Sequence, residues 1–415
     1  MFSDQETFSD LIEKVFRLSI HSIMPKAEDF IPFNIDTTKK SFLLALGKSS
    51  INMTMAFLEA FEGEIDGFTL IPRQYNSKEL ISKRIVKLEG DHPYISQNNY
   101  ENTQKVLNHL SEHRYEQVFC LLSGGGSALF AQVDSFFSTE IKTRLIQEFI
   151  DHGADIESLN TIRTLLSSVK GGQLIDYLGD AEIINFFMTD VPEERYDLVA
   201  SGPTANLINQ GTELSFLEDF FNEDQKKYLK EKLSRLQLAK SNMIQNHVIY
   251  DAKKIIRNLE LFFRDTKYKT LILPECYNLN SSELAKLHTD LLLRVSDKGS
   301  HVLITSGEIH STKSKNKEYR GGRNLDYLLR LYLEIGNSRE FFAFSFDTDG
   351  IDGNGDHAGG FISNNKTLSQ PTSRMINRAL VNSASYNVFE ELGLLFKSGL
   401  TGVNVSDIRL IFFEV

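Results

Sequence analysis

Short apolar runs that end at glycine, proline or polar residues recur along this chain of 415 residues. Such runs predict buried β-strands, because a strand that is covered on both faces needs no polar side. Segments with helical spacing lie between the runs, and this alternation indicates an α/β fold with parallel sheets covered by helices. The runs are Ser41–Leu46, Val118–Leu122, Ile183–Met188, His247–Tyr250, Thr270–Leu273, Val302–Thr305 and Phe341–Phe346.

A heavily charged segment separates these runs into two series. Residues 219–238 are typical of a solvated helix, and we expect a domain boundary near residue 240. The length, together with 41% hydrophobic residues, suffices for two cores. The sequence therefore predicts two α/β domains, residues 1–240 and 241–415. Other expected helices include one at the N-terminus and segments at 51–61, 138–150 and 155–179.

Charge and cysteine content argue against several classes of protein. The formal net charge of −11 disfavours nucleic acid as the main partner. Two distant cysteines, Cys120 and Cys276, are no disulfide framework and fit a reducing cytoplasm. The N-terminus lacks the pattern of a signal peptide, and no run approaches the ~20 apolar residues that span a membrane. We expect a cytoplasmic protein without a membrane partner, and the sequence leaves a homodimer open.

Polar and glycine-rich residues follow the carboxyl ends of the expected strands. Ligands of open parallel sheets bind at this edge. The position of these clusters therefore predicts one or more ligand sites. The clusters are Gly47-Lys48, Ser123–Ser127, Asp190, Ser306-Gly-Glu308 and Asp347–Asp356.

The most glycine-rich of these clusters suggests an anion site. Bare backbone amides between a strand and a helix approach a phosphate or carboxylate closely. The alternative is a tight turn without a ligand. Two nucleotide motifs fail here, since Phe42 replaces the first glycine of a P-loop and Leu129 replaces the third glycine of a dinucleotide fingerprint. The cluster consists of Ser123, Gly124, Gly125, Gly126 and Ser127.

A second cluster is dense in carboxylates. Asp347, Asp349, Asp352 and Asp356 lie within ten residues, and they could hold Mg²⁺, orient phosphates or accept a hydroxyl proton. A solvated surface loop is the alternative. The segment fails the EF-hand pattern, because His357 occupies the position of the required glycine.

Single polar residues add further candidates. Arg323 could bind a carboxylate or phosphate, or simply pair with an acid at a helix start. Lys48 could likewise bind an anionic ligand or pair with an acid. Asp190 could be a general base or cap a turn. His92 fits a loop better than a metal site, because no second ligand lies at zinc spacing. Three residues could reach a ligand or lie on the polar face of a helix: Asn160, Arg163 and Lys170.

Taken together, these motifs resemble the glycerate 2-kinase family. They occur in the family's order from about residue 40 to the C-terminus. The matching segments are Gly47-Lys48, Asp91-His-Pro93, Leu122–Leu129, Asn160-Thr-Ile-Arg163, Lys170–Leu174, Thr189-Asp-Val-Pro192, Ser201-Gly-Pro-Thr204, Ser306-Gly-Glu308, Gly321-Gly-Arg-Asn324, Asp349–Gly353 and Thr401–Val405 with Asp407.

The resemblance implies a fold and a reaction. The fold would pair a Rossmann-like three-layer N-terminal domain with a leucine-rich C-terminal domain across an interdomain cleft. The reaction would be transfer of the ATP γ-phosphate to the 2-hydroxyl of D-glycerate with Mg²⁺. The implied catalytic residues are Lys48, Asp190 and Arg323. The implied ligands of substrate and phosphate are Ser123, Gly124, Gly125, Gly126, Ser127, Asn160, Lys170, Glu308 and Asn324, and those of the metal are Asp349 and Asp352.

Departures from the family pattern leave alternatives open. Ser306 replaces a usual glycine, Val403 replaces a usual threonine, and Pro93 is followed by Tyr94 instead of the usual sequence. The alternatives are a kinase of a related hydroxy acid in surface polysaccharide synthesis, a hydroxypyruvate reductase and a noncatalytic regulator.

Overall fold

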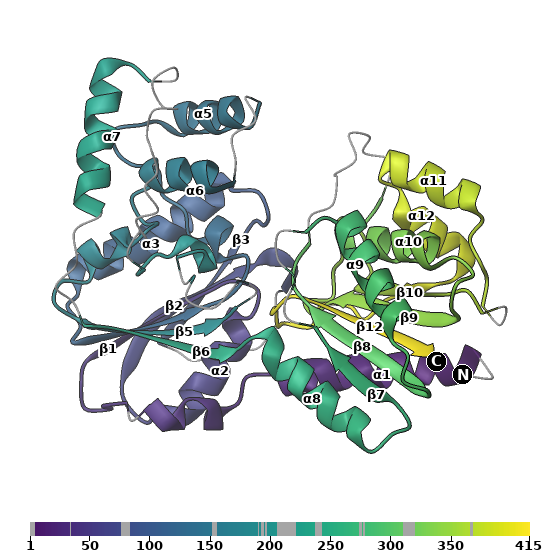
Figure 1. Ribbon diagram of the computed structural model, residues 1–415. Helices are drawn as coiled ribbons and strands as arrows, with labels where there is room; N and C mark the ends of the chain where they lie inside the picture. The colour runs from purple at the N-terminus through teal and green to yellow at the C-terminus, as the bar shows by residue number, and fades with distance from the viewer. Residues whose placement is uncertain are drawn as a thin grey trace. The chain divides into compact units, whose positions relative to one another are not determined.

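The computed structural model describes residues 5–415 with short gaps and divides into two compact units (Figure 1). The first unit is Pro25–Ile249, and the second combines Met1–Met24 with Tyr250–Val415. Residues 1–24, which the sequence analysis assigned to the first domain, thus lie in the second unit. The description leaves out 1–4, 34, 76–83, 152–155, 190, 192–194, 196, 206–220, 237–242, 274–275, 277–278, 310–319 and 366–367, and the side chains of 150–159.

Among the described residues of the first unit, six strands form one sheet in the order β3-β2-β1-β4-β5-β6. The five strands from β3 to β5 in this order pair in parallel. Three of them confirm strands that the sequence predicted, at 41–46, 118–122 and 183–188. The strands are β1 (Ser41–Leu46), β2 (Ile65–Pro72), β3 (Ile85–Gly90), β4 (Gln117–Leu122), β5 (Glu182–Met188) and β6 (Ile244–Tyr250).

Helices cover both faces of this sheet, as Figure 1 shows. Alternate residues of a strand point to opposite faces. Phe42 of β1 packs on Tyr115, and Phe119 of β4 packs on Phe57 of α2, with ring centroids 5.0 and 4.8 Å apart. The helices are α2 (Ser50–Ala60), α3 (Gln97–Glu112), α4 (Gly126–Leu129), α5 (Thr139–Asp151), α6 (Ile156–Leu165) and α7 (Glu223–Leu236), with 3₁₀ turns η1 (Ala27–Asp29), η2 (Ile31–Phe33), η3 (Arg73–Tyr75), η4 (Gln173–Tyr177) and η5 (Val199–Ser201).

The second unit has a mixed sheet, so the prediction of a wholly parallel sheet was wrong for this half. Its order within the described residues is β11-β10-β9-β12-β8-β7. The predicted strands β7, β8 and β9 share a direction, but the last strand of the chain, β12, enters antiparallel between β8 and β9. The strands are β7 (Lys269–Ile272), β8 (Ser300–Ser306), β9 (Phe341–Asp347), β10 (Gly359–Ser363), β11 (Leu395–Phe396) and β12 (Asp407–Glu414).

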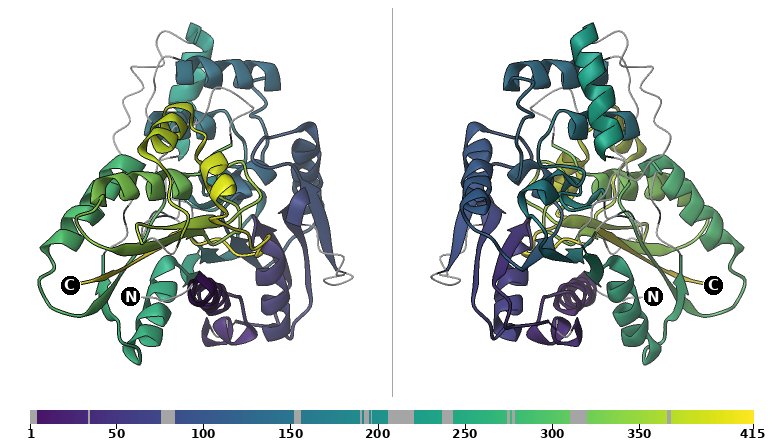
Figure 2. Two further views of the ribbon diagram at one scale, coloured as in Figure 1. Left: turned by 90° about the vertical axis from the view of Figure 1, so that its right-hand side faces the viewer. Right: turned by 90° about the vertical axis from the view of Figure 1, so that its left-hand side faces the viewer.

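The N-terminal helix is part of this second unit. Phe8 of α1 stacks on Phe342 of β9 at 4.0 Å between ring centroids, and Phe16 packs on Phe346 at 5.1 Å. Each buried phenylalanine contributes about 1.5–3 kcal/mol. Figure 2 shows α1 beside α8. The helices are α1 (Gln5–Ser22), α8 (Ala252–Arg264), α9 (Ser281–Arg294), α10 (Arg323–Ile335), α11 (Ser373–Asn382) and α12 (Ser385–Leu392).

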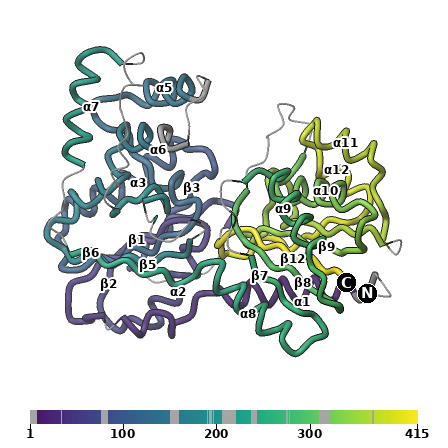
Figure 3. The backbone as a smooth tube through the Cα atoms, in the orientation of Figure 1, coloured from purple at the N-terminus to yellow at the C-terminus, as the bar shows by residue number. Residues whose placement is uncertain are grey.

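The tube in Figure 3 shows β6 beside β5. The sequence analysis assigned residues 247–250 to the second series of strands, and this assignment was wrong. β6 is the edge strand next to β5, where the amide of Ile183 donates to the carbonyl of Met243 at 2.8 Å. No helix in the described part of the chain combines the length and apolar character needed to cross a bilayer.

Candidate active site

Two neighbouring strands of the first unit bring the predicted anion site together. β1 and β4 pair in register, with Leu46 opposite Leu122, so the residues that follow them meet. The amide of Lys48 donates to the carbonyl of Gly124 at 2.9 Å, and the amide of Ser49 donates to Ser123 Oγ at 3.1 Å. Parallel pairing therefore places Lys48 beside the glycine-rich turn, which the sequence could only suggest.

Two glycines are required by the closeness of these segments. Gly47 has φ +114°, and a Cβ there would lie 2.4 Å from Ser123 Oγ. Gly125 has φ +86°, and its Cβ would lie 3.1 Å from His92 Nε2 and 3.3 Å from Lys48 Cγ. The bare turn thus lies against a lysine and a histidine, a suitable setting for an anion. His92 lies in a loop, as the sequence predicted, and its ring lies beside this turn.

Lys170 joins the far end of the same turn. Its ammonium donates to the carbonyl of Ser127 at 2.8 Å and lies 3.5 Å from Ser201 Oγ. The hydroxyls of Ser127 and Ser201 are 2.7 Å apart. Burial, followed by the charges of Lys142 and Arg163, lowers the pKa of Lys170 to about 7. An ammonium held only by neutral oxygens retains attraction for an anion.

The other two candidates of the first unit have different outcomes. Asp190 lies outside the described residues. Asn160 lies on α6, and its hydrogen bond within the described part of the chain is with Arg163 of the same helix, Nη1 to Oδ1 at 3.5 Å. The structure therefore joins Lys48 and Lys170 to the glycine-rich turn, and it joins Asn160 to Arg163.

The antiparallel β12 creates the cluster of the second unit. Ser306 ends β8 and Asp347 ends β9, while Asp407 begins β12 between them and pairs opposite Asp347. The start of an antiparallel strand lies at the same sheet edge as the ends of its neighbours. This topology brings a third acidic side chain, after those of Glu308 and Asp347, to the edge where α10 begins.

Arg323, the first residue of α10, is held by these carboxylates. Its Nε donates to Asp407 and its Nη2 donates to both Glu308 and Asp347, each at 2.7 Å. Burial alone would lower the pKa of Arg323, yet the three carboxylates hold the pKa well above its ordinary value. Nη1 makes no hydrogen bond in the described part of the chain, so this nitrogen is the part of the guanidinium left for a ligand.

A second, fully buried guanidinium supports the first. Arg409 donates from Nη2 to Asp407 at 3.0 Å and from Nη1 to the carbonyl of Gly307 at 2.8 Å. Asp407 also accepts from Asn324 Nδ2 at 2.8 Å. Asp407 thus shares its two oxygens among two arginines and an amide, and it fixes Arg323 relative to β8.

Asp352 acts at the start of α10. Its two oxygens accept from the backbone amides of Asn324 and Leu325, each at 3.2 Å, and its side chain is fully buried. A carboxylate suits the first turn of a helix, where amides lack intrahelical partners. Asn324 is held on its other side by the hydroxyl of Ser345. The geometry therefore gives Asp352 the role of a helix cap.

The acidic run as a whole does not converge on one point. Asp349 accepts from the amide of Ile351 at 2.7 Å, and Asp356 pairs with Arg320 and Lys397. Among the described residues, no group of three His, Cys, Asp or Glu side chains is arranged to hold a metal ion.

Sequence reasoning missed Asp407 and Arg409 as site residues. Asp407 appeared only as part of a family motif, because a site was expected at the ends of strands rather than at their starts. A usable signal was present, since Asp407 directly precedes the C-terminal apolar run Ile408–Phe413 and Arg409 interrupts it. A charge inside a buried strand requires a partner.

Comparisons with known proteins match both halves of the chain. Residues 9–221 match a domain of unknown function, DUF4147, and residues 301–407 match the MOFRL family. A D-glycerate 2-kinase of Thermotoga maritima is 27% identical over 98% of this chain and 98% of its own. A protein of Agrobacterium vitis, provisionally named a hydroxypyruvate reductase, is 25% identical over 97% of this chain and 93% of its own.

A solved structure agrees in fold. The crystal structure of a glycerate kinase from Thermotoga maritima covers 99% of this chain and 100% of its own, with a TM-score of 0.79 at 25% identity. The predicted α/β class is thereby confirmed.

Proposed function

Because the chain belongs to the glycerate kinase family, in which a DUF4147 domain precedes a MOFRL domain, we propose that it is an ATP-dependent glycerate 2-kinase. It would transfer the γ-phosphate of ATP to the 2-hydroxyl of D-glycerate. Close relatives in sequence carry this name over nearly their whole length. The free acid, rather than a related hydroxy acid, is the substrate that this resemblance supports.

The glycine-rich turn of the first unit is the observation that carries the proposal. Its amides lie beside Lys48, and its last carbonyl binds the ammonium of Lys170 at 2.8 Å. Phosphoryl transfer needs little covalent chemistry from the protein, and its catalysis is mainly positioning and charge stabilisation. A bare turn flanked by two lysines supplies both for a phosphate chain.

The reaction needs one general base. The 2-hydroxyl oxygen forms a bond to the γ-phosphorus, the bond from phosphorus to the β–γ bridging oxygen breaks, and ADP departs. The hydroxyl proton must go to an acceptor. We assign this acceptor to Asp190, which follows β5 in the sequence, on the family resemblance.

In the second unit, Arg323 would bind an anion through Nη1. Its other two nitrogens hold three carboxylates, so they fix the orientation of the guanidinium. Arg323 therefore acts as a positioned cation with one free edge, rather than as a fork that grips a carboxylate with two nitrogens.

The carboxylates around Arg323 could add one or two ligands to a Mg²⁺ ion that is already bound to the phosphates of the nucleotide. They do not form a complete metal site by themselves. Mg²⁺ commonly takes one or two carboxylates together with phosphate oxygens and waters. Glu308 meets this need best, because its side chain is 37% exposed whereas that of Asp347 is 6% exposed. When bound, the ion would neutralise charge on the phosphates. Asp349 stays a proposed ligand, and Asp352 is occupied as a cap.

The compartment proposed from the sequence is the cytoplasm. Cys120 and Cys276 are both buried thiols outside any disulfide. A reducing compartment suits such thiols.

ADP release tests this function directly. Purified protein with Mg-ATP should release ADP when D-glycerate is present and should release little without it. Arg323→Lys keeps the charge but loses the planar edge, so we expect turnover to fall while circular dichroism stays unchanged. Binding of ATP without ADP release would reject the kinase.

A parallel assay separates the reductase. Hydroxypyruvate with NADH should show no loss of absorbance at the NADH band, since the glycine-rich turn lacks the dinucleotide fingerprint. Oxidation of NADH would favour the reductase function over the kinase function.

A further inference from the structure

A buried group of charged residues lies within the helical layer of the first unit. Helices α5, α6 and α7 pack around their own apolar cluster, which includes Leu145, Ile162 and Leu229. Beside this cluster, four cations and a single carboxylate of the described residues are wholly or partly buried, and Arg163 is the most exposed of them. They are Lys142, Arg163, Lys170, Lys232 and Asp134.

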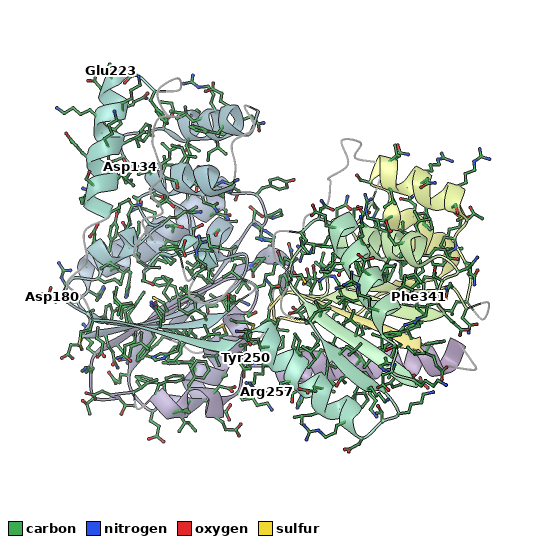
Figure 4. The ribbon with its side chains drawn as sticks, in the orientation of Figure 1. Asp134, Asp180, Glu223, Tyr250, Arg257 and Phe341 are labelled. Carbon is green, nitrogen blue, oxygen red and sulfur yellow. The ribbon has the colours of Figure 1, made fainter. Side chains whose placement is uncertain are left out.

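One of the cations, Lys232, has an acidic partner. The ammonium of Lys232 forms a short hydrogen bond to Asp134 and also donates to the carbonyl of Ser167 at 2.6 Å. Asp134, labelled in Figure 4, accepts from the hydroxyl of Tyr228 as well, at 2.8 Å. This carboxylate is therefore neutralised by α7. Within the described part of the chain, the other three cations have no carboxylate partner.

Lys142 is the most unusual of the three. Lys142 is 4% exposed, and its Nζ has no hydrogen-bond partner among the described residues. A buried ammonium without a partner is strongly destabilising, since it has lost its water and gained nothing in return. Burial, followed by the charges of Lys232 and Arg163, lowers the pKa of Lys142 to about 8. Half of the molecules would still carry this charge near pH 8.

Lys170 connects the group to the glycine-rich turn. It is 5% exposed, and its hydrogen bonds within the described part of the chain are to the neutral oxygens of Ser127 and Ser201. The charges of Lys142 and Arg163 both lower its pKa. These three cations thus lie near enough to repel one another. Such an arrangement is unfavourable unless an anion joins them.

We propose that Lys142, Arg163 and Lys170 form an inner phosphate site behind the glycine-rich turn, and that this site takes one phosphate group of a polyphosphate chain. That the chain is ATP rests on the proposed function. A phosphate group offers three acceptor oxygens and up to two negative charges, which match three cationic donors better than a carboxylate does. Lys142 is new in this role, because no motif in the sequence indicated it.

Inorganic tripolyphosphate is the probe, and titration calorimetry of the full chain is the measurement. Lys142→Met keeps the length of the side chain and removes its charge, so we expect at least a tenfold loss of affinity. The same variant should melt at a higher temperature than the wild type in the absence of anion. A purely structural lysine would not give this opposite pair of effects. Lys227→Met, at an exposed position of α7, should change neither quantity.

Proton uptake provides a second readout. A bound anion raises the pKa of the lysines, so binding at pH 8 should take up protons, and affinity should fall as pH rises from 7 to 9. The charged groups that face Lys142 are Arg163, Lys170 and Lys232, with Asp134 beyond Lys232. Lys142→Met should reduce the uptake, which is seen by repeating the titration in buffers of different ionisation enthalpy.

Unchanged tripolyphosphate affinity in folded Lys142→Met would overturn the inner site. If that variant does not fold, unchanged affinity in Arg163→Gln would do the same. The outcome is separable from the kinase assay. Normal ADP release by the wild type with unaltered binding by the variants rejects only the inner site. Weakened binding by the variants, with no turnover by the wild type, rejects only the kinase.

Discussion

The cations of the two units lie in opposite electrostatic surroundings. In the first unit, Lys170 binds neutral oxygens, and Lys142 has no hydrogen-bond partner among the residues that the structure describes. In the second unit, Arg323 binds three carboxylates and Arg409 supports it through Asp407. Both regions hold positive charge beside a sheet. Within the described residues, carboxylates balance Arg323 and Arg409 in the second unit, whereas Lys142 and Lys170 in the first unit have no carboxylate partner.

This contrast indicates a division of labour. With the inner site proposed above, the first unit would gain stability when an anion binds, so it would be suited to hold phosphate. In the second unit three carboxylates surround two guanidinium groups, so Arg323 is fixed in place and the remaining negative charge would favour a cation such as Mg²⁺. Substitutions in the two units should therefore fail in different ways: loss of binding in the first, and loss of stability in the second.

The largest effect on stability is expected at Asp407. Asp407→Asn keeps the shape but leaves the fully buried guanidinium of Arg409 without its carboxylate partner, and it removes one of the three carboxylates around Arg323, which together cost about 3–5 kcal/mol of unfolding free energy. Urea unfolding measures the change. Asp297→Asn is the control, because Asp297 is 69% exposed and pairs with Lys269 on the surface, and such pairs contribute about 0–1 kcal/mol. Equal losses of unfolding free energy in the two variants would contradict the stabilising role of the carboxylates around Arg323 and Arg409.

Lys48 should affect turnover instead. Lys48→Met removes a cation beside the glycine-rich turn, and loss of one such group lowers kcat by about 10²–10³-fold. Unfolding in urea should stay within about 0.5 kcal/mol of the wild type, because the lysine does not support the sheet core. Lys227→Met controls for loss of charge in the same unit. Normal kcat in Lys48→Met would contradict the proposal that cations of the first unit act on the phosphates.

The pH dependence of stability should have opposite signs in the two units. Burial raises the pKa of Asp326 from 3.8 to about 6, so the native state keeps a proton that the unfolded chain loses. Unfolding free energy from this group therefore falls between pH 4 and 6. Burial lowers the pKa of Lys142 from 10.5 to about 8, so the contribution of this lysine to stability rises between pH 8 and 10.

Each slope should vanish with its own substitution. Asp326→Asn should remove up to roughly 3 kcal/mol of change in the acid window, and Lys142→Met should remove a similar amount in the alkaline window. Urea unfolding across pH 4–10 compares them with the wild type. Slopes that survive the substitutions would show that other groups control the pH dependence.

Asp352 should give the smallest effect. As a cap, Asp352→Asn weakens hydrogen bonds to two amides and costs about 1 kcal/mol. The Mg²⁺ concentration that half-saturates ADP release should not change. A tenfold rise in that concentration, with unchanged stability, would make Asp352 a metal ligand after all.

Three strands of the first sheet could be predicted from short apolar runs in the sequence. Ser41–Leu46 became β1 with the predicted bounds, and the family and α/β class were confirmed. Buried parallel strands are continuous apolar runs, so they are visible in sequence. β2 and β3 were not predicted. β3 mixes exposed and buried residues, and its pattern is too weak to detect alone.

Pairing between distant segments was the part that sequence could not supply. An apolar run says that a strand is buried, but not which neighbours it has, so β6 was assigned to the wrong sheet. The same limit hid β12, whose entry between β8 and β9 creates the cluster around Arg323. Gly47 and Lys48 were recognised, because adjacent parallel strands bring their carboxyl ends together by rule.

The fate of the γ-phosphorus of ATP tests the central claim most directly. Phosphorus NMR of a reaction with Mg-ATP and D-glycerate should show this signal replaced by that of 2-phosphoglycerate, in step with the appearance of ADP. A signal that remains on ATP, moves to inorganic phosphate or moves to 3-phosphoglycerate would contradict the account.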